Sequence, residues 1–277
     1  MSIETEAGST YVLGTTQREY ERVRRQAEVW QRAAERVLDR VDPAPGSRCL
    51  DAGCGPGVTM RQLAQRVGPQ GRVVGIDIDE GLGADSVARL RHEGHRQCQF
   101  RAHDLRGDTA IPGAPYDLVY ARLVLFHLPE RVDVLARLWD AVAPGGHMVV
   151  QDYDLAAVGS VPRMQIDDQL AGFIADAFTA AGCEIRAGAL LPRLFEQAGV
   201  GLPDATDVAG RLDRLVDAAP MLEGVVRSLL PGAIVRGMVT EAGGDALLAQ
   251  LHNSVAEDPN RPLLWPLLLG AWKRKGS

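Results

Sequence analysis

Apolar residues recur with a helical period near the start of the chain. Over residues 17–41 they are spaced by four, three, four, three and four positions, with arginine and glutamate between them. This spacing places the apolar side chains on one face, so it predicts a single amphipathic helix with a narrow apolar stripe. The helix is expected to end before Pro43 and the Pro45-Gly46 pair, since these residues interrupt helices.

A different pattern begins at residue 48, where short apolar runs alternate with segments of helical periodicity. Such alternation predicts parallel βαβ units and an α/β, doubly wound, Rossmann-like sheet with right-handed crossovers. The expected strands are 48–52, 72–77, 97–102, 117–121 and 147–153, and the expected helices are 58–67, 84–93 and 131–142.

The second half of the chain is mainly helical by the same criteria. Its pattern predicts helices at 161–181, 190–197, 215–239 and 245–255, and strands at 206–212 and 263–273. The helix at 215–239 is expected to break at Pro231-Gly232.

Composition and charge exclude several classes of protein. The 277 residues are 46% hydrophobic and 24% charged, which is typical of a soluble globular chain. The formal net charge of −6 is unfavourable for a nucleic-acid binder, which needs cations to neutralise phosphates. The four cysteines form no C-x-x-C pair, and we expect them to be buried and reduced. The acidic N-terminus is unlike a secretory signal, and the longest apolar run, 263–272, is too short for a membrane span; both features predict a cytoplasmic protein.

The strongest motif is the segment Cys-Leu-Asp-Ala-Gly-Cys-Gly-Pro-Gly at residues 49–57. The expected strand ends in Asp51, and Gly53, Gly55 and Gly57 then lead into a helix. Glycines at such a turn let backbone N–H groups approach a ligand that a Cβ atom would keep away. A carboxylate two residues before the first glycine is unfavourable for a pyrophosphate, and it favours a ligand with a cationic amine.

Acidic residues also end the next two expected strands. Asp77 follows the second strand at a position that suits a ribose diol, whereas Asp79 is expected to cap the following helix. Asp104 follows the third strand. We expect it either to accept a hydrogen bond from an adenine amino group, with Leu105 packed against the adenine ring, or to cap a loop. The carboxyl ends of parallel strands share one edge of the sheet, so Asp51, Asp77 and Asp104 together fit the amine, ribose and adenine of one molecule.

With these motifs the sequence resembles the class I S-adenosylmethionine (SAM)-dependent methyltransferases, especially the small-molecule enzymes of the ubiquinone and menaquinone biosynthesis type. The resemblance covers roughly residues 48–155, through the segments 50–57, 73–79, 103–105, 116–129 and 143–152. It implies a seven-stranded mixed sheet, six strands parallel and the last antiparallel. It further implies an N-terminal helical lid (1–42) and a SAM-binding domain (43–277) with helical insertions at about 156–186 and 213–258.

The resemblance also implies site residues. Gly53 and Gly55 would contact the methionine part of SAM, with the backbone of Ala121 and Arg122 beside the sulfonium. The expected cofactor set comprises Tyr20, Gln26, Asp51, Gly53, Gly55, Asp77, Ile78, Asp104, Leu105, Ala121 and Arg122. From the N-terminal segment, Tyr11, Tyr20, Arg24 and Gln26 would reach the methionine carboxylate or the substrate; alternatively the helix covers a core face or forms a dimer contact.

The chemistry expected of such a site is an in-line methyl transfer in which alignment and removal of water carry most of the catalysis. A base is needed only if the acceptor must lose a proton, and His127 is the candidate, with a purely structural role as the alternative. No metal is expected, because Ala121-Arg122 supplies no acid at the end of the fourth strand. The residues after Tyr120 lack the [DN]-P-P-[YF] motif used for nucleic-acid amines.

The expected substrate is a hydrophobic small molecule methylated on O, N or C in bacterial secondary metabolism. Apolar residues of 161–181 and 215–239 are expected to form core, with some of them lining the substrate pocket. Two alternatives stay open: a SAM-binding protein that does not methylate, such as a cyclase or a ligand sensor, and a nicotinamide-dependent oxidoreductase. A homo-oligomer formed through the N-terminal helix is a further possible partner arrangement.

Overall fold

The computed structural model describes residues 17–276. Most of the elements that the pattern predicts are present, several with the predicted bounds. The helices are α1 (Gln17–Val29), α2 (Gln31–Val41), α3 (Val58–Val67), α4 (Glu80–His92), α5 (Arg131–Asp140), α6 (Gln165–Ala180), α7 (Ala187–Gln197), α8 (Leu215–Val235) and α9 (Glu241–Glu257). The strands are β1 (Arg48–Ala52), β2 (Arg72–Asp77), β3 (Cys98–Ala102), β4 (Tyr116–Arg122), β5 (Val142–Asp154), β6 (Gly159–Ser160), β7 (Ala205–Ala209), β8 (Leu212–Arg214), β9 (Pro262–Leu264) and β10 (Leu267–Arg274).

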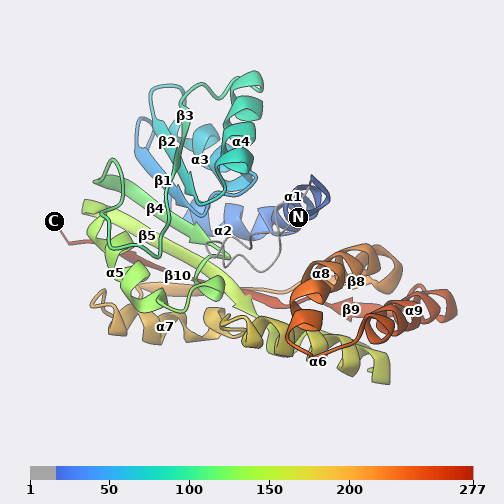
Figure 1. Ribbon diagram of the computed structural model, residues 1–277. Coiled ribbons are helices and arrows are strands. Elements are labelled where there is room, and N and C mark those ends of the chain that lie inside the picture. Colours follow the sequence, from blue (N-terminus) through green and yellow to red (C-terminus); the bar gives the residue numbers. More distant parts are fainter. Residues whose placement is uncertain (1–16, 277) are drawn as a thin grey trace, which may run out of the picture.

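The main sheet has seven strands in the order β3-β2-β1-β4-β5-β10-β7 (Figure 1). Strands β1 to β5 are mutually parallel, and β10 is antiparallel to both of its neighbours, β5 and β7. Six strands therefore run one way and the last strand runs the other way. This confirms the predicted doubly wound, Rossmann-like sheet.

Helices cover both faces of this sheet. Helices α5 and α7 pack over one face, on a core that includes Leu50, Ile76 and Phe195. Helices α2, α3 and α4 cover the other face, where Met60 and Tyr120 are fully buried. Strands that are buried on both faces must be apolar throughout, which explains the continuous apolar runs in the sequence.

The register of the parallel strands places the predicted acids at one edge. Asp51 in β1 lies opposite Gly75 in β2, and Asp77 at the end of β2 lies opposite Ala102 in β3. The chain reaches Asp104 two residues later. The carboxyl edge is thus the place where all three acids converge, as open α/β sheets require of a ligand site.

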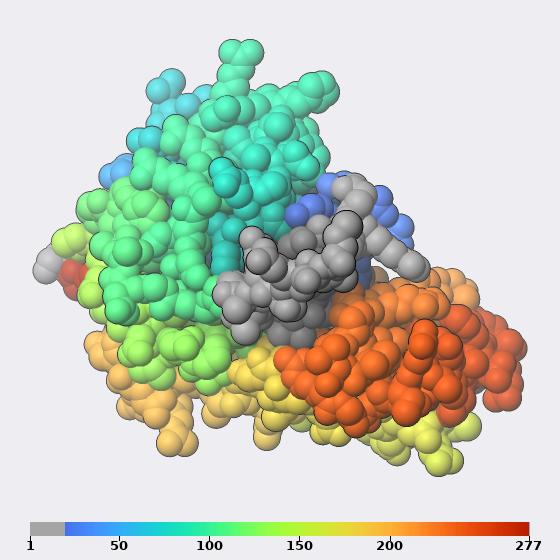
Figure 2. Space-filling model, viewed as in Figure 1, coloured from blue at the N-terminus to red at the C-terminus, as the bar shows by residue number. Residues whose placement is uncertain are grey.

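A second, mainly helical layer lies beside this edge of the sheet. Helices α6, α8 and α9 pack on one another and on a small sheet with the order β6-β9-β8. Figure 2 shows the α8–α9 segment, orange to red, at the lower right of the molecule, below and to the right of the blue-green surface of the first half of the chain. Contacts between α1 and α8 join this lobe to the N-terminal helices.

The predicted single helix over residues 17–41 is wrong, because the structure divides it into α1 and α2 at Trp30. Trp30 has φ −99° and ψ 9°, outside the helical geometry, and its side chain is 2% exposed. The indole N–H of Trp30 donates to the Tyr153 hydroxyl at 2.7 Å. Burying this large side chain against β5 therefore fixes a break that the apolar spacing alone does not reveal.

Three other boundaries also differ from the prediction. The strand expected at 206–212 is two strands, β7 and β8, in different sheets, and the strand expected at 263–273 is likewise split into β9 and β10. Pro266 separates β9 from β10, because proline has no N–H to donate to a neighbouring strand. By contrast, α8 continues through Pro231, because Leu229 and Ala233 on either side of it are buried in the core.

Helix α8 is long and apolar enough to cross a membrane by length and composition alone. It contains Pro220 and Pro231, and it packs against α1, α6 and α9 of the same fold. Part of its apolar surface, including Val226 and Leu229, is buried in the helical layer, whereas Val235 is exposed. All four cysteines are buried and free, as the sequence predicted.

Candidate active site

A cavity of about 830 Å³ lies at the carboxyl edge of the main sheet. Its walls come from the glycine-rich turn after β1, the ends of β2 and β4, the loop after β3, and helix α1. The volume falls in the range of sites that bind drug-sized ligands and cofactors. Of the expected cofactor set, all residues except Ala121 line this cavity, and so does His127.

The glycine-rich turn does not present free N–H groups to this cavity, so the prediction that it would do so is wrong. The amides of Gly53 and Cys54 both donate to the carbonyl oxygen of Ile76, at 2.8 and 3.0 Å. The amide of Gly55 donates to the Asp77 carboxylate at 2.8 Å. A turn whose amides are already used cannot cradle a phosphate, which disfavours a dinucleotide ligand.

The glycines are required for backbone shape and close approach. Gly53 has φ +68°, and a Cβ atom built there would lie 2.4 Å from a Val124 methyl carbon. Gly55 has φ +45°, and a Cβ there would meet nothing within 4 Å. Since both conformations are left-handed, they favour glycine, and the open space beside Gly55 belongs to the cavity.

Three buried polar atoms of cavity-lining residues have no hydrogen-bond partner. They are Nε2 of His103 after β3, Oδ2 of Asp51 in β1 and Nη1 of Arg122 at the end of β4. Burial raises the pKa of Asp51 to about 7, although the Arg122 charge opposes this rise. Asp51 Oδ2 is an acceptor and Arg122 Nη1 is a donor, so these two atoms match the ammonium and carboxylate of an amino acid. Buried polar groups left without partners are costly, which indicates a ligand that supplies the missing bonds.

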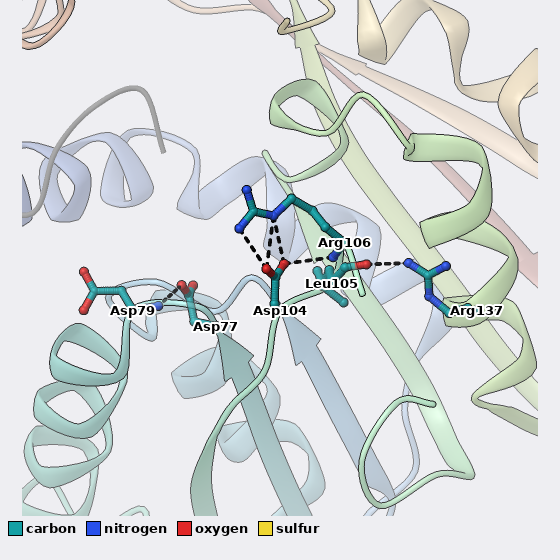
Figure 3. Close-up of polar contacts among 6 residues, drawn as sticks. All are labelled: Asp77, Asp79, Asp104, Leu105, Arg106 and Arg137. Carbon is teal, nitrogen blue, oxygen red and sulfur yellow. Dashed lines mark hydrogen bonds and ion pairs between the residues drawn. The ribbon is translucent and has the colours of Figure 1, made fainter. Parts of the chain in front are cut away.

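Asp77 and Asp79 have different roles. The Asp77 carboxylate accepts from the amides of Gly55 and Asp79, at 2.8 and 3.0 Å, and burial raises its pKa. One lone pair on each oxygen remains for a diol. Asp79 accepts from the Leu82 amide at 2.9 Å and caps α4, as predicted. In Figure 3 the Asp79 carboxylate points away from Asp77.

Asp104 is held by its neighbour Arg106. The guanidinium of Arg106 contacts both carboxylate oxygens at 2.8 to 3.1 Å, and this pair lowers the pKa of Asp104 (Figure 3). The Arg106 amide also donates to Asp104, which is the loop cap weighed as the alternative. Leu105 is 8% exposed in the cavity wall, and Ile78 is 46% exposed. An adenine amino group would therefore share Asp104 with Arg106.

Helix α1 forms one side of the cavity. The Tyr20 hydroxyl donates to Asp79 at 2.7 Å, and the Gln26 amide donates to the Tyr153 hydroxyl at 3.0 Å. Arg22, which the sequence analysis did not select, is buried and donates to Gln26 at 2.7 Å. The only signal in the sequence is its place one turn before Gln26 on the same helix. Tyr11 lies outside the described residues, and Arg24 is not part of the wall.

His127 ends a 3-10 turn, Leu125–His127, that follows β4. Burial and the Arg22 charge lower the pKa of His127 to about 4, so the imidazole is neutral at pH 7. Asp152 in β5 holds the turn by accepting from the Phe126 amide at 2.9 Å. Leu123, just before it, has φ +58°, a strained value for a residue other than glycine.

A second, smaller cavity of about 90 Å³ continues from the first. The two share Arg22, Gln26, Leu123 and His127 as walls. Among the apolar residues of α6 and α8, Ile174, Phe178, Met221, Leu222 and Val225 line the smaller cavity, whereas Phe173, Val226 and Leu229 pack in the core. The apolar faces of α6 and α8 thus serve partly as pocket and partly as core, as predicted.

Comparison with known proteins agrees with this geometry. Residues 49–146 match a family model described as a methyltransferase domain. Nocamycin O-methyltransferase of Saccharothrix syringae is 37% identical over 121 residues, covering 44% of this chain and 43% of that protein. Trans-aconitate 2-methyltransferase of Deinococcus radiodurans is 27% identical over 226 residues, covering 78% of this chain and 76% of that protein.

A solved structure extends the likeness over most of the fold. Phosphoethanolamine N-methyltransferase 2 of Haemonchus contortus, in complex with SAM, has a TM-score of 0.52 at 16% identity, covering 89% of this chain and 53% of that one. Residues 49–146 thus resemble a methyltransferase domain, and the fold as a whole is similar to that of this solved structure. The chain spans about half the length of the first curated relatives it matches, 43% and 54%.

Proposed function

We propose that this protein transfers a methyl group from SAM to O, N or C of a hydrophobic small molecule in bacterial secondary metabolism. The observation that carries the proposal is the pair of unpartnered buried atoms, Asp51 Oδ2 and Arg122 Nη1, in one cavity. A methionine group has the ammonium and carboxylate that these atoms need. Nocamycin O-methyltransferase, among the relatives, has a natural product in its name.

The remaining contacts to the cofactor belong to the same proposal. Asp77 would bind the ribose and Asp104 the adenine amino group. Gly53 and Gly55 would allow the close approach, the backbone of Ala121 and Arg122 would lie beside the sulfonium, and α1 would close the cavity. The side chains that complete the wall are Tyr20, Gln26, Ile78 and Leu105.

Bound SAM supplies an electrophilic methyl group on a sulfonium. The protein's own contribution is to align the acceptor behind that methyl group and to keep water out. The apolar walls from α6 and α8 suit both tasks. His127 lines both cavities, and its lowered pKa makes it a weak proton acceptor.

Several wider features belong to the same proposal. It includes the lid at 1–42, the SAM-binding domain at 43–277, and the helical insertions at about 156–186 and 213–258. The enzyme would act in the cytoplasm on a free small molecule, without nucleic acid, membrane or metal, and α1 offers a surface for a homo-oligomer. Within residues 17–276, no group of three or more His, Cys, Asp or Glu side chains is arranged to hold a metal ion.

Thermal unfolding with SAM, S-adenosylhomocysteine (SAH) and NADH, each added separately, tests the proposal. A ligand at about 100 times its Kd adds about 2.7 kcal/mol to the free energy of unfolding. We expect SAM and SAH to raise the Tm, and NADH to leave it unchanged. Gly53→Ala tests the site, because its Cβ would collide with Val124; Gly94→Ala, where a Cβ meets nothing, controls for the strain of a left-handed alanine.

Methyl transfer is then measured with labelled SAM against a library of hydrophobic hydroxy, amino and carboxylic compounds. A labelled product confirms a methyltransferase. If SAM and SAH bind but no compound accepts the label, a non-methylating SAM-binding protein becomes the better description. If neither SAM nor SAH shifts the Tm, the proposed function is wrong.

A further inference from the structure

The smaller cavity lacks the acidic side chains of the larger one. The larger cavity is lined by both acidic and basic side chains, namely Asp51, Asp77, Asp79, Glu80, Asp104 and Glu130 with Arg22, Arg106 and Arg122. Among the described lining residues of the smaller cavity there is no aspartate or glutamate, and its polar side chains include Arg22, Gln26, His127 and Tyr153. The smaller cavity is therefore mainly apolar, with one guanidinium at its opening.

The Tyr153 hydroxyl is arranged as a donor toward this cavity. It accepts the indole N–H of Trp30 at 2.7 Å and the amide N–H of Gln26 at 3.0 Å. Both lone pairs of the hydroxyl oxygen therefore accept hydrogen bonds, and the Tyr153 O–H can donate one to a bound ligand. Burial raises the pKa of Tyr153 to about 12, so the proton stays on the oxygen at neutral pH.

Arg22 brings a positive charge to the opening between the cavities. Its side chain is 7% exposed and lies in the wall of both cavities. The guanidinium donates to Gln26, and its stem lies against α8, where a Cβ atom at Gly224 would come within 3.0 Å of the Arg22 side chain. A guanidinium keeps its charge in proteins and binds carboxylates and other oxyanions.

The geometry points to an acceptor that enters as an oxyanion, a carboxylate or an enolate on an apolar body, held by the Arg22 guanidinium and the Tyr153 hydroxyl. This inference rests on the proposed function. A lone pair of the oxyanion forms the new O–CH3 bond while the C–S bond breaks and its electron pair returns to sulfur. An anion and a cation thus become a neutral ester or ether and a neutral thioether, and no proton has to be removed.

The inference also explains why a weak base suffices. His127 is neutral and has a lowered pKa, so it is poorly suited to deprotonate an alcohol. An acceptor that is already ionised needs no such step. The apolar wall of Ile174, Phe178 and Met221 then holds the rest of the acceptor.

Calorimetric binding of benzoate and benzamide to the protein saturated with SAH tests the inference without any turnover. The two probes have nearly the same shape and differ in charge. We expect benzoate to bind at least about tenfold more tightly than benzamide, which corresponds to about 1.4 kcal/mol. Arg22→Gln should remove this preference, measured again on protein saturated with SAH. Arg36→Gln, which breaks an exposed ion pair with Asp207 elsewhere, should keep the preference.

A second pair of variants guards against a folding defect in Arg22→Gln. Gly224→Ala keeps the charge but displaces the Arg22 stem, so it should weaken the benzoate preference. Gly172→Ala on α6, where a Cβ meets nothing within 4 Å, should not. Equal affinity for the two probes, or a preference that survives Arg22→Gln, overturns the inference. Failure of the wild-type protein to bind SAH overturns the proposed function instead.

Discussion

At the scale of single residues, the site depends on groups whose ordinary ionisation is altered by burial. Asp51 is 2% exposed, and its pKa is raised to about 7. Its unpartnered oxygen can accept a hydrogen bond from an ammonium group only when a ligand that carries one is bound. Asp77 differs, because its carboxylate already receives two backbone amides in the free protein.

SAH binding should therefore depend on pH through Asp51. The ammonium of SAH binds the ionised carboxylate, so below pH 7 binding must release a proton, and affinity should rise with pH by up to about tenfold per unit until it levels near 7. Calorimetry between pH 6 and 7 in phosphate and in imidazole, which both buffer there and have different ionisation enthalpies, measures this proton release.

Asp51→Asn is the control for this experiment. It should bind SAH more weakly, with no proton release over the same pH range. If the variant and the wild-type protein show the same pH dependence, Asp51 is not the group that titrates.

At the scale of elements, the first turn of α4 joins two parts of the site. Asp79 caps this helix by accepting from Leu82, and it also accepts the hydroxyl of Tyr20 from α1. Thr240 caps α9 in the same way, by accepting from Gly243 at 3.1 Å. Removing the Thr240 cap is therefore a control, because it removes a helix cap without changing the contacts of α1 and α4.

Asp79→Ala should cost more stability than Thr240→Ala. Loss of a cap costs about 1 kcal/mol in each variant, and Asp79→Ala also removes the bond from Tyr20. Tyr20→Phe should destabilise the wild-type protein slightly and should have no further effect in the Asp79→Ala background. Urea unfolding of the four proteins of this cycle measures the coupling. Fully additive effects would show that the Tyr20–Asp79 bond contributes nothing.

At the scale of the whole molecule, two buried carboxyls oppose stability at neutral pH. The pKa values of Asp51 and Asp152 are each raised to about 7, mainly by burial. Between pH 4 and 7 the folded state keeps protons that the unfolded state has already lost. The stabilising contribution of each group is thus complete below about pH 4 and is lost as pH rises toward 7.

Asp152→Asn should flatten this pH dependence. Each such group changes the free energy of unfolding by at most about 1.4 kcal/mol per pH unit. Relative to wild type, the variant should therefore gain stability as pH rises from 4 to 7. Parallel urea titrations at several pH values measure the difference in free energy of unfolding between the two proteins. The contributions of the other carboxyl groups are the same in both and drop out of this difference. A difference that stays constant over this range would contradict the raised pKa.

The sequence by itself determined the class of fold and the cofactor cavity. The spacing of apolar residues differs between strands and helices, so the βαβ order could be recognised from the sequence. Asp51, Asp77 and Asp104 stand at the ends of parallel strands, and such ends lie at one edge of the sheet. The glycine spacing identified the turn before α3. These features are local in the chain, and a pattern of neighbouring residues is enough to reveal them.

Only the tertiary structure decided the features that depend on distant residues. Trp30 interrupts the first helix because it packs on Tyr153, and Pro231 does not interrupt α8 because Leu229 and Ala233 are buried. The amides of the glycine turn are consumed by Ile76 and Asp77 of the next strand. Arg22 gained its place between the cavities by packing on Gly224, about 200 residues away in the chain. Contacts of this kind arise from the packing of separate elements, and no local period records them.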